Sequence, residues 1–361
     1  MSALLLLLHF IPFTWGESKE FFEESEKDFS LRSIGQLEVK NFKGNLQVQG
    51  WPLDKIRIKL KKSVKAGSPE VAKELLTRIS YRLVSRNARD EEIEISNQYS
   101  EQLSIKDRLK ENEHPTVRMD LIVFAPSRIK LDAWVANGQL TLKNWNAPVT
   151  IRSNQGTVLG EDITADTTSV FCSACAISLK NIKGSVHCVG GEGKISLEGV
   201  AGSQIYSEVR EGSLSLVRIQ GDQLYVANRG DISGNSLEGN IQFQSRQAAV
   251  DLKNISGHVS GTSEKGNISL AIQKWTPLGQ SLVESIDGSI SLTLPWRVSA
   301  NVDIWSPNGK TNVDFPITGT TREQILDQNS SKRWVGRLRD GGELIKIFTK
   351  TGNIKVFRSS F

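Results

Sequence analysis

The chain has 361 residues, enough for one large domain or two to three ordinary ones, and 38% of them are hydrophobic. Thirty glycines against ten prolines, with 7% aromatic residues, favour many short strands and tight turns over a helical bundle. The 45 Lys and Arg against 40 Asp and Glu give a net charge of +5, which is too mild for a dedicated nucleic-acid binder. Three cysteines and four scattered histidines are too few for a disulfide framework or a multi-histidine metal centre, so no cofactor is expected.

The first 16 residues predict a secretory signal peptide with cleavage after Gly16. Leu4 to Phe13 is an apolar run broken only by His9 and Pro12, and it is too short to span a bilayer. The alternatives are a buried first strand or a retained membrane anchor, since no Lys or Arg precedes the run. We expect an exported protein, periplasmic or at the cell surface, with no transmembrane span in the mature chain and with residues 17–34 as a linker.

A phrase of the form Gly-x-apolar-x-apolar recurs down most of the chain. From Gly184 to Gly266 a glycine returns every nine or ten residues, with Ala248 as the one substitution. The phrase itself begins at several of these glycines and at others outside the series: Gly138, Gly193, Gly212, Gly239, Gly266, Gly288 and Gly352.

Two versions of this short motif alternate along the chain, so the full repeating unit has about 18 to 19 residues. Within each phrase apolar residues hold alternate positions, as in a strand with one buried face, and glycines fall where the backbone turns or passes close to a neighbour. One such unit cannot bury its apolar face alone, but stacked units can. The pattern predicts an all-β, single-chain β-solenoid with its core at 137–294.

Both flanks of this core predict caps. Leu37 to Val48 matches the inner coils, and Ser68-Pro69 followed by apolar residues up to Leu76 predicts one short helix. Residues 35–136 are therefore expected to form a β-rich N-terminal cap with a first coil, and the polar segment 97–115 an exposed loop. Residues 295–361 lose the strict spacing and are expected to form a C-terminal cap, because open strand edges invite polymerisation.

The segment from Asn41 to Trp51, followed by the short helix and the series of Gly-x-Ile-x-Leu phrases, resembles the bacterial putative-adhesin β-solenoid family, a DUF4097-like domain of unknown function. The resemblance covers roughly 35–358. It implies an exported, non-catalytic β-solenoid and provides no catalytic residues to carry over.

The three cysteines leave several roles open. Cys172 and Cys175 have C-x-x-C spacing, and Cys188 follows about one coil later. They could be buried structural residues, could form one disulfide within the corner or between adjacent coils, or could serve metal or redox chemistry. The nearby Gly190 to Ile195 segment resembles a calcium-binding β-roll motif, but Lys194 replaces its aspartate and would repel the cation.

The densest basic strip is Lys55, Arg57, Lys59 and Lys61, which alternates with Ile56, Ile58 and Leu60. Strict alternation predicts a strand with its apolar residues inward and four cations outward. The cations could simply discourage edge pairing, or they could contact an anionic envelope polymer or lipid headgroup.

No arrangement of nucleophile, base and acid is evident in the sequence. We therefore expect a non-enzymatic binding or structural module of the bacterial envelope, monomeric or a small oligomer, whose partner is an unknown envelope polymer, surface or protein. The alternatives are a carbohydrate-active β-helix enzyme, which would carry a cluster of acidic residues on one face, and a self-assembling bactofilin-like scaffold.

Overall fold

The computed structural model describes residues 19–30, 35–85, 92–99, 115–319, 321–326 and 329–359. The predicted signal peptide lies outside these residues, as does most of the loop expected at 97–115. The chain forms two compact units that divide between Cys175 and Ala176, inside the segment assigned to the solenoid core. Each unit is built from strands, with one helix in the first, and the prediction of an all-β solenoid is confirmed.

The first unit contains eight strands, the start of a ninth, and the helix. The bounds are β1 Lys19–Ser30, β2 Gln36–Asn41, β3 Leu46–Trp51, β4 Lys55–Ala66, α1 Pro69–Arg78, β5 Ile79–Ser85, β6 Glu92–Tyr99, β7 Thr116–Pro126, β8 Lys130–Trp145 and the beginning of β9 Val149–Arg229. The end of the expected loop, Asn97 to Tyr99, belongs to β6.

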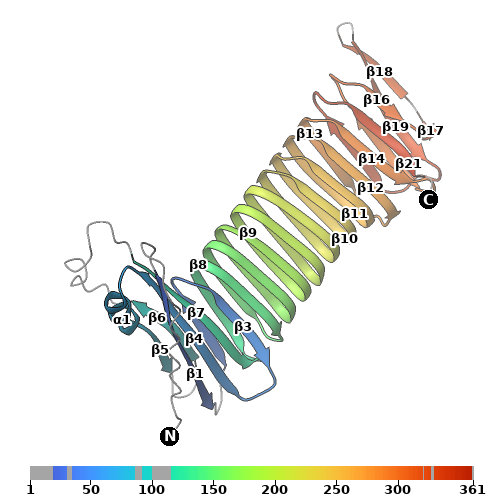
Figure 1. Ribbon diagram of the computed structural model, residues 1–361. Coiled ribbons are helices and arrows are strands. Elements are labelled where there is room, and N and C mark those ends of the chain that lie inside the picture. Colours follow the sequence, from blue (N-terminus) through green and yellow to red (C-terminus); the bar gives the residue numbers. More distant parts are fainter. Residues whose placement is uncertain are drawn as a thin grey trace. The chain divides into compact units, whose positions relative to one another are not determined.

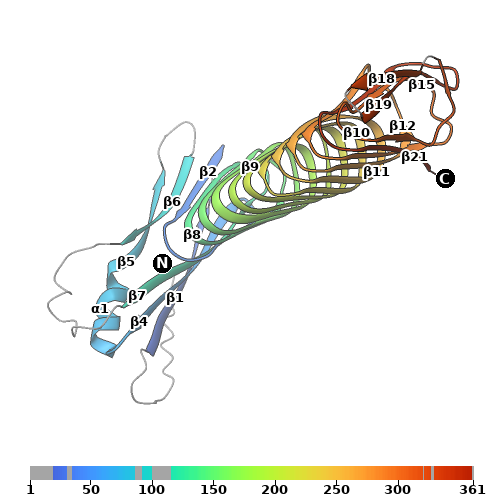
Figure 2. The same ribbon diagram turned by 90° about the horizontal axis from the view of Figure 1, so that it is seen from above.

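Strand β8 bends at Asn137 and Gly138 and so contributes to two faces of this unit. Its first half pairs in parallel with β2, which pairs with β6, and β6 pairs antiparallel with β5. Its second half pairs in parallel with β3, which is followed by β7 and then by the antiparallel strands β4 and β1. Figure 2 shows β2, β5 and β6 on one side of the unit and β1, β4 and β7 on the other. The coil predicted at Leu37 to Val48 is therefore part of the stack, and the cap is an insertion that follows it.

Helix α1 confirms the predicted short helix. Ser68 is its N-cap, and its hydroxyl accepts a hydrogen bond of 3.3 Å from the Val71 N–H, while Pro69 occupies the first turn. The buried face of Ala72, Leu75 and Leu76 packs against β4. The helix therefore closes one end of the apolar interior.

The segment expected to be a linker, residues 17–34, instead contains strand β1. It pairs with β4 in antiparallel register from Lys19 opposite Ala66 to Ser30 opposite Lys55. This segment has no alternating pattern of apolar residues, because both faces of β1 mix carboxylates with Phe21, Phe22 and Phe29. Pairing with β4 explains why this segment forms a strand, because a row of cations on β4 lies opposite the carboxylates of β1.

The second unit contains the rest of β9 and the strands that follow it. Their bounds are β10 Ile232–Gln247, β11 Val250–Lys265, β12 Ile268–Trp275, β13 Ser281–Asp287, β14 Ile290–Pro295, β15 Ala300–Trp305, β16 Thr311–Val313, β17 Ile317–Thr318, β18 Thr321–Leu326, β19 Asn329–Leu338, β20 Leu344–Thr349 and β21 Ile354–Ser359. Parallel register places Leu214 beside Ile232, Ile232 beside Val250, and Val250 beside Ile268, so these coils have 18 residues. Figure 1 shows β10 and β11 as neighbouring coils in yellow and orange.

Two columns of glycines form the corners of the second unit. A Cβ on Gly239 would lie 2.2 Å from the carbonyl oxygen of Gly221, and a Cβ on Gly230 would lie 1.5 Å from that of Gly212. Both glycines also have positive φ, where residues with a side chain are strained. The nine-residue spacing in the sequence thus reflects backbone that passes directly over backbone. At Ala248 the strand is interrupted between β10 and β11.

The predicted C-terminal cap does not follow sequence order. Strands β20 and β21 continue the parallel stack by pairing with β13 and β14, although Ile290 and its partner Ile354 are far apart in sequence. Strands β15 and β16 then pair with β20 and β21. The antiparallel strand β19 covers β15 and so ends this face.

Candidate functional site

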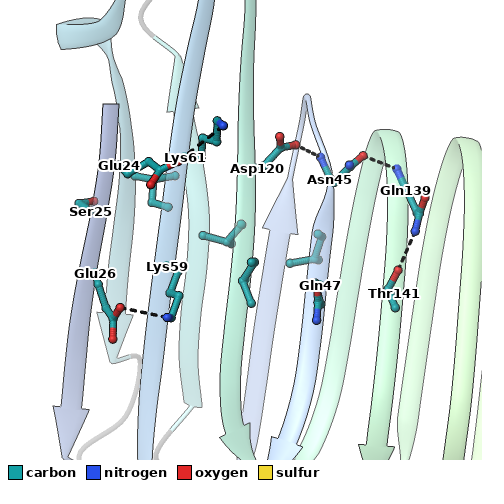
Figure 3. A pocket seen from close by; sticks show the side chains of 14 residues that line it. Glu24, Ser25, Glu26, Asn45, Gln47, Lys59, Lys61, Asp120, Gln139 and Thr141 are labelled. Atoms are coloured by element: carbon teal, nitrogen blue, oxygen red, sulfur yellow. Dashed lines mark hydrogen bonds and ion pairs between the residues drawn. The ribbon is translucent and has the colours of Figure 1, made fainter. Parts of the chain in front are cut away.

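A groove of about 560 Å³ lies on the outward face of β1, β4, β7, β3 and β8 in the first unit. We call it the N-terminal groove. Figure 3 shows the side chains that line it, which are mainly charged groups, amides and hydroxyls. Its lining residues are Glu24, Ser25, Glu26, Asn45, Leu46, Gln47, Lys59, Leu60, Lys61, Asp120, Leu121, Ile122, Gln139 and Thr141.

Alternation along each strand creates this face. On β4 the apolar residues Ile56, Ile58 and Leu60 are at most 4% exposed, so the residues between them point outward. Register then lines up Lys59 with Ile122, Ile122 with Gln47, and Gln47 with Thr141 across neighbouring strands. The groove therefore combines residues of five strands, and of these only β3 with β4 and β7 with β8 follow each other directly in the sequence.

A series of hydrogen bonds crosses β7, β3 and β8 at one end of the groove. The Asp120 carboxylate accepts from the Asn45 backbone N–H at 2.7 Å and from Arg118 Nε at 2.8 Å. The Asn45 side-chain oxygen accepts from the Gln139 backbone N–H at 3.0 Å. The Gln139 amide donates in turn to the Thr141 hydroxyl at 3.0 Å (Figure 3). These bonds hold the polar lining in fixed positions.

Two cations of the basic strip predicted on β4, Lys59 and Lys61, line the other side of the groove, and β1 supplies carboxylates to all four cations of the strip. Asp28 pairs with Lys55 at 2.9 Å and with Arg57 at 2.7 Å. Glu26 pairs with Lys59 at 3.1 Å, and Glu24 pairs with Lys61 at 3.6 Å (Figure 3). The structure thus brings Lys55, Arg57, Lys59 and Lys61 together as predicted, but opposite a row of acids that the sequence did not place there. Their contact with an anionic surface stays a prediction.

Asp28 is the most strongly perturbed of these acids. Its hydrogen bonds to the Arg57 guanidinium, and then those to Lys55, hold the pKa of the carboxyl far below its ordinary value of 3.8. The same hydrogen bond with Asp28 raises the pKa of Arg57. Both groups therefore stay charged over the physiological range, and the strip carries little net charge.

Beyond the groove, Trp51 and Phe124 extend the same outward face. Their ring centroids lie 5.5 Å apart with an interplanar angle of 33°. The Trp51 indole donates to the Lys55 carbonyl at 2.8 Å, and the Arg57 guanidinium lies 5.6 Å from its ring centroid. An aromatic surface thus adjoins the polar lining.

Gln47 differs from Asn45 and Gln139, the other two amides of the groove. Its side chain is half-buried on the outward face of β3, and among the residues that the structure describes no group forms a hydrogen bond with its amide. A side-chain amide offers two donors and one acceptor. Gln47 therefore presents these groups to whatever enters the groove.

The cysteines are placed apart from this groove. Cys172 and Cys175 form a disulfide, with Cα atoms 6.0 Å apart, and Cys188 is a buried free cysteine. Burial raises the pKa of the Cys188 thiol, which keeps it protonated and unreactive. No three His, Cys, Asp or Glu side chains within the described ranges gather as metal ligands.

Sequence reasoning identified the cations of the groove but missed Asn45, Gln47, Gln139 and Thr141. Each of them occupies an ordinary outward position of a repeat phrase. The one available signal was the acidic segment around Glu23 to Asp28, whose charge is opposite to that of the β4 strip. Without the strand pairing, that signal could not show which residues meet.

No curated protein matches the sequence. Among the solved structures that match at low similarity are the following two. A putative cell adhesion protein from Clostridium sporogenes is 10% identical over 94% of this chain and 100% of its own, with a TM-score of 0.23. A putative adhesin from Bacteroides fragilis is 11% identical over 93% of this chain and 97% of its own, with a TM-score of 0.24.

The family model described as Toastrack DUF4097 matches residues 84–357, which is most of the chain. The matched region begins at the end of β5, after the Asn41 to Trp51 segment. It includes β6, β7 and the stacked coils of both units. The family is a domain of unknown function and indicates no enzymatic reaction. The resemblance seen in the sequence is confirmed, and the chain belongs to the Toastrack DUF4097 family.

Proposed function

We propose that this protein is an exported, non-catalytic binding module of the bacterial cell envelope and that its N-terminal groove is the surface that binds an envelope polysaccharide. The membership of a family with no indicated reaction is consistent with such a role. Within the described ranges no helix is long and apolar enough to cross a membrane. The proposal combines the adhesin-type role implied by the sequence with a specific surface.

The observation that carries the proposal is the unpartnered amide of Gln47 at the centre of a polar, preorganised lining. Saccharide hydroxyls both donate and accept hydrogen bonds, and side-chain amides match them in both roles. Gln139 and Thr141 are held by their hydrogen bond, so they lose little conformational freedom when a ligand binds. The neighbouring rings of Trp51 and Phe124 add apolar surface for the faces of sugar rings.

The state of the carboxylates favours binding over catalysis. A glycosidase needs two carboxyl groups free to exchange protons or attack a sugar. In the groove Glu24 and Glu26 form ion pairs with lysines of β4, and Asp120 accepts hydrogen bonds from Asn45 and Arg118. We therefore place the alternative of a carbohydrate-active enzyme second. An assay for newly released reducing ends tests that alternative directly.

The groove is tested by binding to immobilised envelope polysaccharides. The double variant Gln47→Ala/Gln139→Ala removes two amides, and we expect its affinity to fall about tenfold or more, as for the loss of two good hydrogen bonds. The matched control is Asn154→Ala/Gln155→Ala, which removes two exposed amides of the same unit outside the groove. Equal binding by the groove variant and the wild type would contradict the groove assignment.

Export needs a separate experiment. We expect the protein in the periplasm or at the cell surface, with a mature chain that begins after Gly16. Cell fractionation with N-terminal sequencing measures both. A cytosolic chain with an intact N-terminus would instead favour the bactofilin-like scaffold.

A further inference from the structure

A second cluster of aromatic and cationic residues lies in the second unit, on two adjacent turns. One turn follows β14 and carries Trp296 and Arg297; the other follows β19 and carries Arg339. Arg297 Cζ lies 4.4 Å from the Trp296 ring centroid, and Arg339 Cζ lies 5.8 Å from the same centroid. The indole is 49% exposed, which is unusual for so large an apolar side chain.

The backbone holds these turns in fixed positions. Val298 N–H donates to the Pro295 carbonyl at 3.0 Å, which closes the first turn, and Gly341 N–H donates to the Leu338 carbonyl at 3.1 Å, which closes the second. Arg339 also donates to the Arg297 carbonyl at 3.3 Å across the two turns. The pairing of β15 with β19 places both turns at the same end of these strands.

The charge balance of this cluster distinguishes it from the one at Trp51. There, both Lys55 and Arg57 lie over the indole, and both form ion pairs with Asp28. At Trp296, no carboxylate of the described residues forms an ion pair with Arg297 or Arg339. The two guanidinium groups lie near the same indole ring and repel each other. An anion bound between or beside them would offset this repulsion.

We infer that Trp296, Arg297 and Arg339 form a binding site for the acidic group of an acidic polysaccharide, separate from the N-terminal groove. Guanidinium groups bind carboxylate and phosphate oxygens through paired, charge-assisted hydrogen bonds. The exposed indole provides a flat apolar surface for the sugar ring that carries the acid. A ligand with both features fits the cluster.

An anionic lipid surface fits less well. Asp340 and Glu343 are exposed and lie on or next to the second turn, where an extended negative surface would repel them. A polysaccharide chain can direct one acidic group to the two arginines while its other acids stay away from these carboxylates, which a continuous lipid surface cannot do. Lipid binding is therefore an alternative that the experiment must distinguish.

The test measures binding of the whole mature protein at low salt to immobilised polygalacturonate, with neutral dextran and phosphatidylglycerol vesicles as parallel probes. The double variant Arg297→Gln/Arg339→Gln should bind polygalacturonate about tenfold more weakly than the wild type. The control Arg229→Gln/Arg246→Gln changes the net charge equally at two exposed arginines that pair with Glu211 and Glu264. It should stay within about twofold of the wild type.

Three results would overturn the inference. The first is a wild-type protein that does not bind polygalacturonate or that binds dextran equally well. The second is an equal loss in both double variants, which would indicate a general charge effect. The third is binding to vesicles without binding to polygalacturonate, which would assign the cluster to lipid. Circular dichroism and the unfolding midpoint of each variant check that the fold is intact.

Discussion

The Arg57 guanidinium holds the Asp28 carboxylate through two hydrogen bonds, of 2.7 Å from Nε and 2.9 Å from a terminal nitrogen. This contact joins β1 to β4, and in it both carboxylate oxygens accept from one guanidinium. Because the carboxylates of β1 lie opposite the cations of β4, a strip that looks strongly basic in the sequence is nearly neutral in the folded protein. These ion pairs add to the antiparallel backbone pairing that joins the two strands.

We predict that acid weakens the pairing of β1 with β4. Because the pKa of Asp28 is lowered in the folded protein, the stabilisation is fully present above its ordinary value of 3.8 and is lost as pH falls below it towards the lowered pKa. Hydrogen exchange should show β1 amides losing protection below about pH 4 before the coils of the second unit do.

The variant Asp28→Asn provides the control for this effect. It should speed exchange in β1 several-fold at neutral pH and should reduce the acid dependence there. Asp314→Asn, which weakens an exposed pair with Arg358 in the second unit, should leave β1 unchanged. If β1 amides in Asp28→Asn exchange like those of the wild type, the ion pair does not hold this edge.

We predict that the corner glycines differ in tolerance according to their neighbours. Gly239 and Gly279 both have positive φ, of 117° and 95°. A Cβ at Gly239 would lie 2.2 Å from the Gly221 oxygen, whereas nothing lies within 4 Å of a Cβ at Gly279. Gly239→Ala should lower the free energy of unfolding by about 3 kcal/mol or more, and Gly279→Ala by about 1 to 2 kcal/mol. Denaturant unfolding measures both, and similar losses would mean that backbone contact is unimportant.

Some corners carry a side chain in a conformation that suits glycine better. Ser236 is exposed and has a φ of 60°. Ser236→Gly should relieve this strain and raise the free energy of unfolding by roughly 0.5 to 1 kcal/mol. Ser233→Gly, at a position of the same strand without positive φ, should act in the opposite direction by a similar amount or more, because glycine weakens a strand interior and the hydrogen bond from the Ser233 hydroxyl to the Leu214 carbonyl is lost. A stabilising effect at both positions would refute the assignment to corner geometry.

The state of the three cysteines predicts how many thiols react before and after unfolding. The native protein should give no rapidly reacting thiol, because Cys188 is buried and its pKa is raised. Unfolding without reductant should release one thiol, and unfolding with reductant should release three. Three thiols without reductant in the exported protein would show that Cys172 and Cys175 are not joined there.

The sequence was sufficient to predict the coils, because their cause is local. A glycine at each corner and an apolar residue at every second position recur at one spacing, and helix α1 carries its own start signal in Ser68 and Pro69. By contrast, β1 has no pattern of its own, and its strand conformation depends on cations that lie about thirty residues later. The insertion of β20 between β13 and β15, and of β21 between β14 and β16, depends likewise on pairing between distant segments.

The candidate groove could be predicted only in part. The alternation in β4 showed which of its side chains face outward, so the cations were identified. Gln47 and Gln139 could not be singled out, because they become neighbours only through the pairing of β3 with β8. Their chemistry is also that of any outward position in the repeat, so only the free amide of Gln47 in the folded protein distinguishes it.

The two glycine columns also restrict how this gene can change in length. A duplication or deletion of one whole winding leaves the glycines of each column against the backbone carbonyls of the neighbouring winding. A change of any other size puts side chains against those carbonyls, and a change by an odd number of residues also turns formerly internal residues towards solvent. Relatives of different length should therefore differ by multiples of about 18 residues within the coils, and irregular insertions should be found where the caps leave the stack.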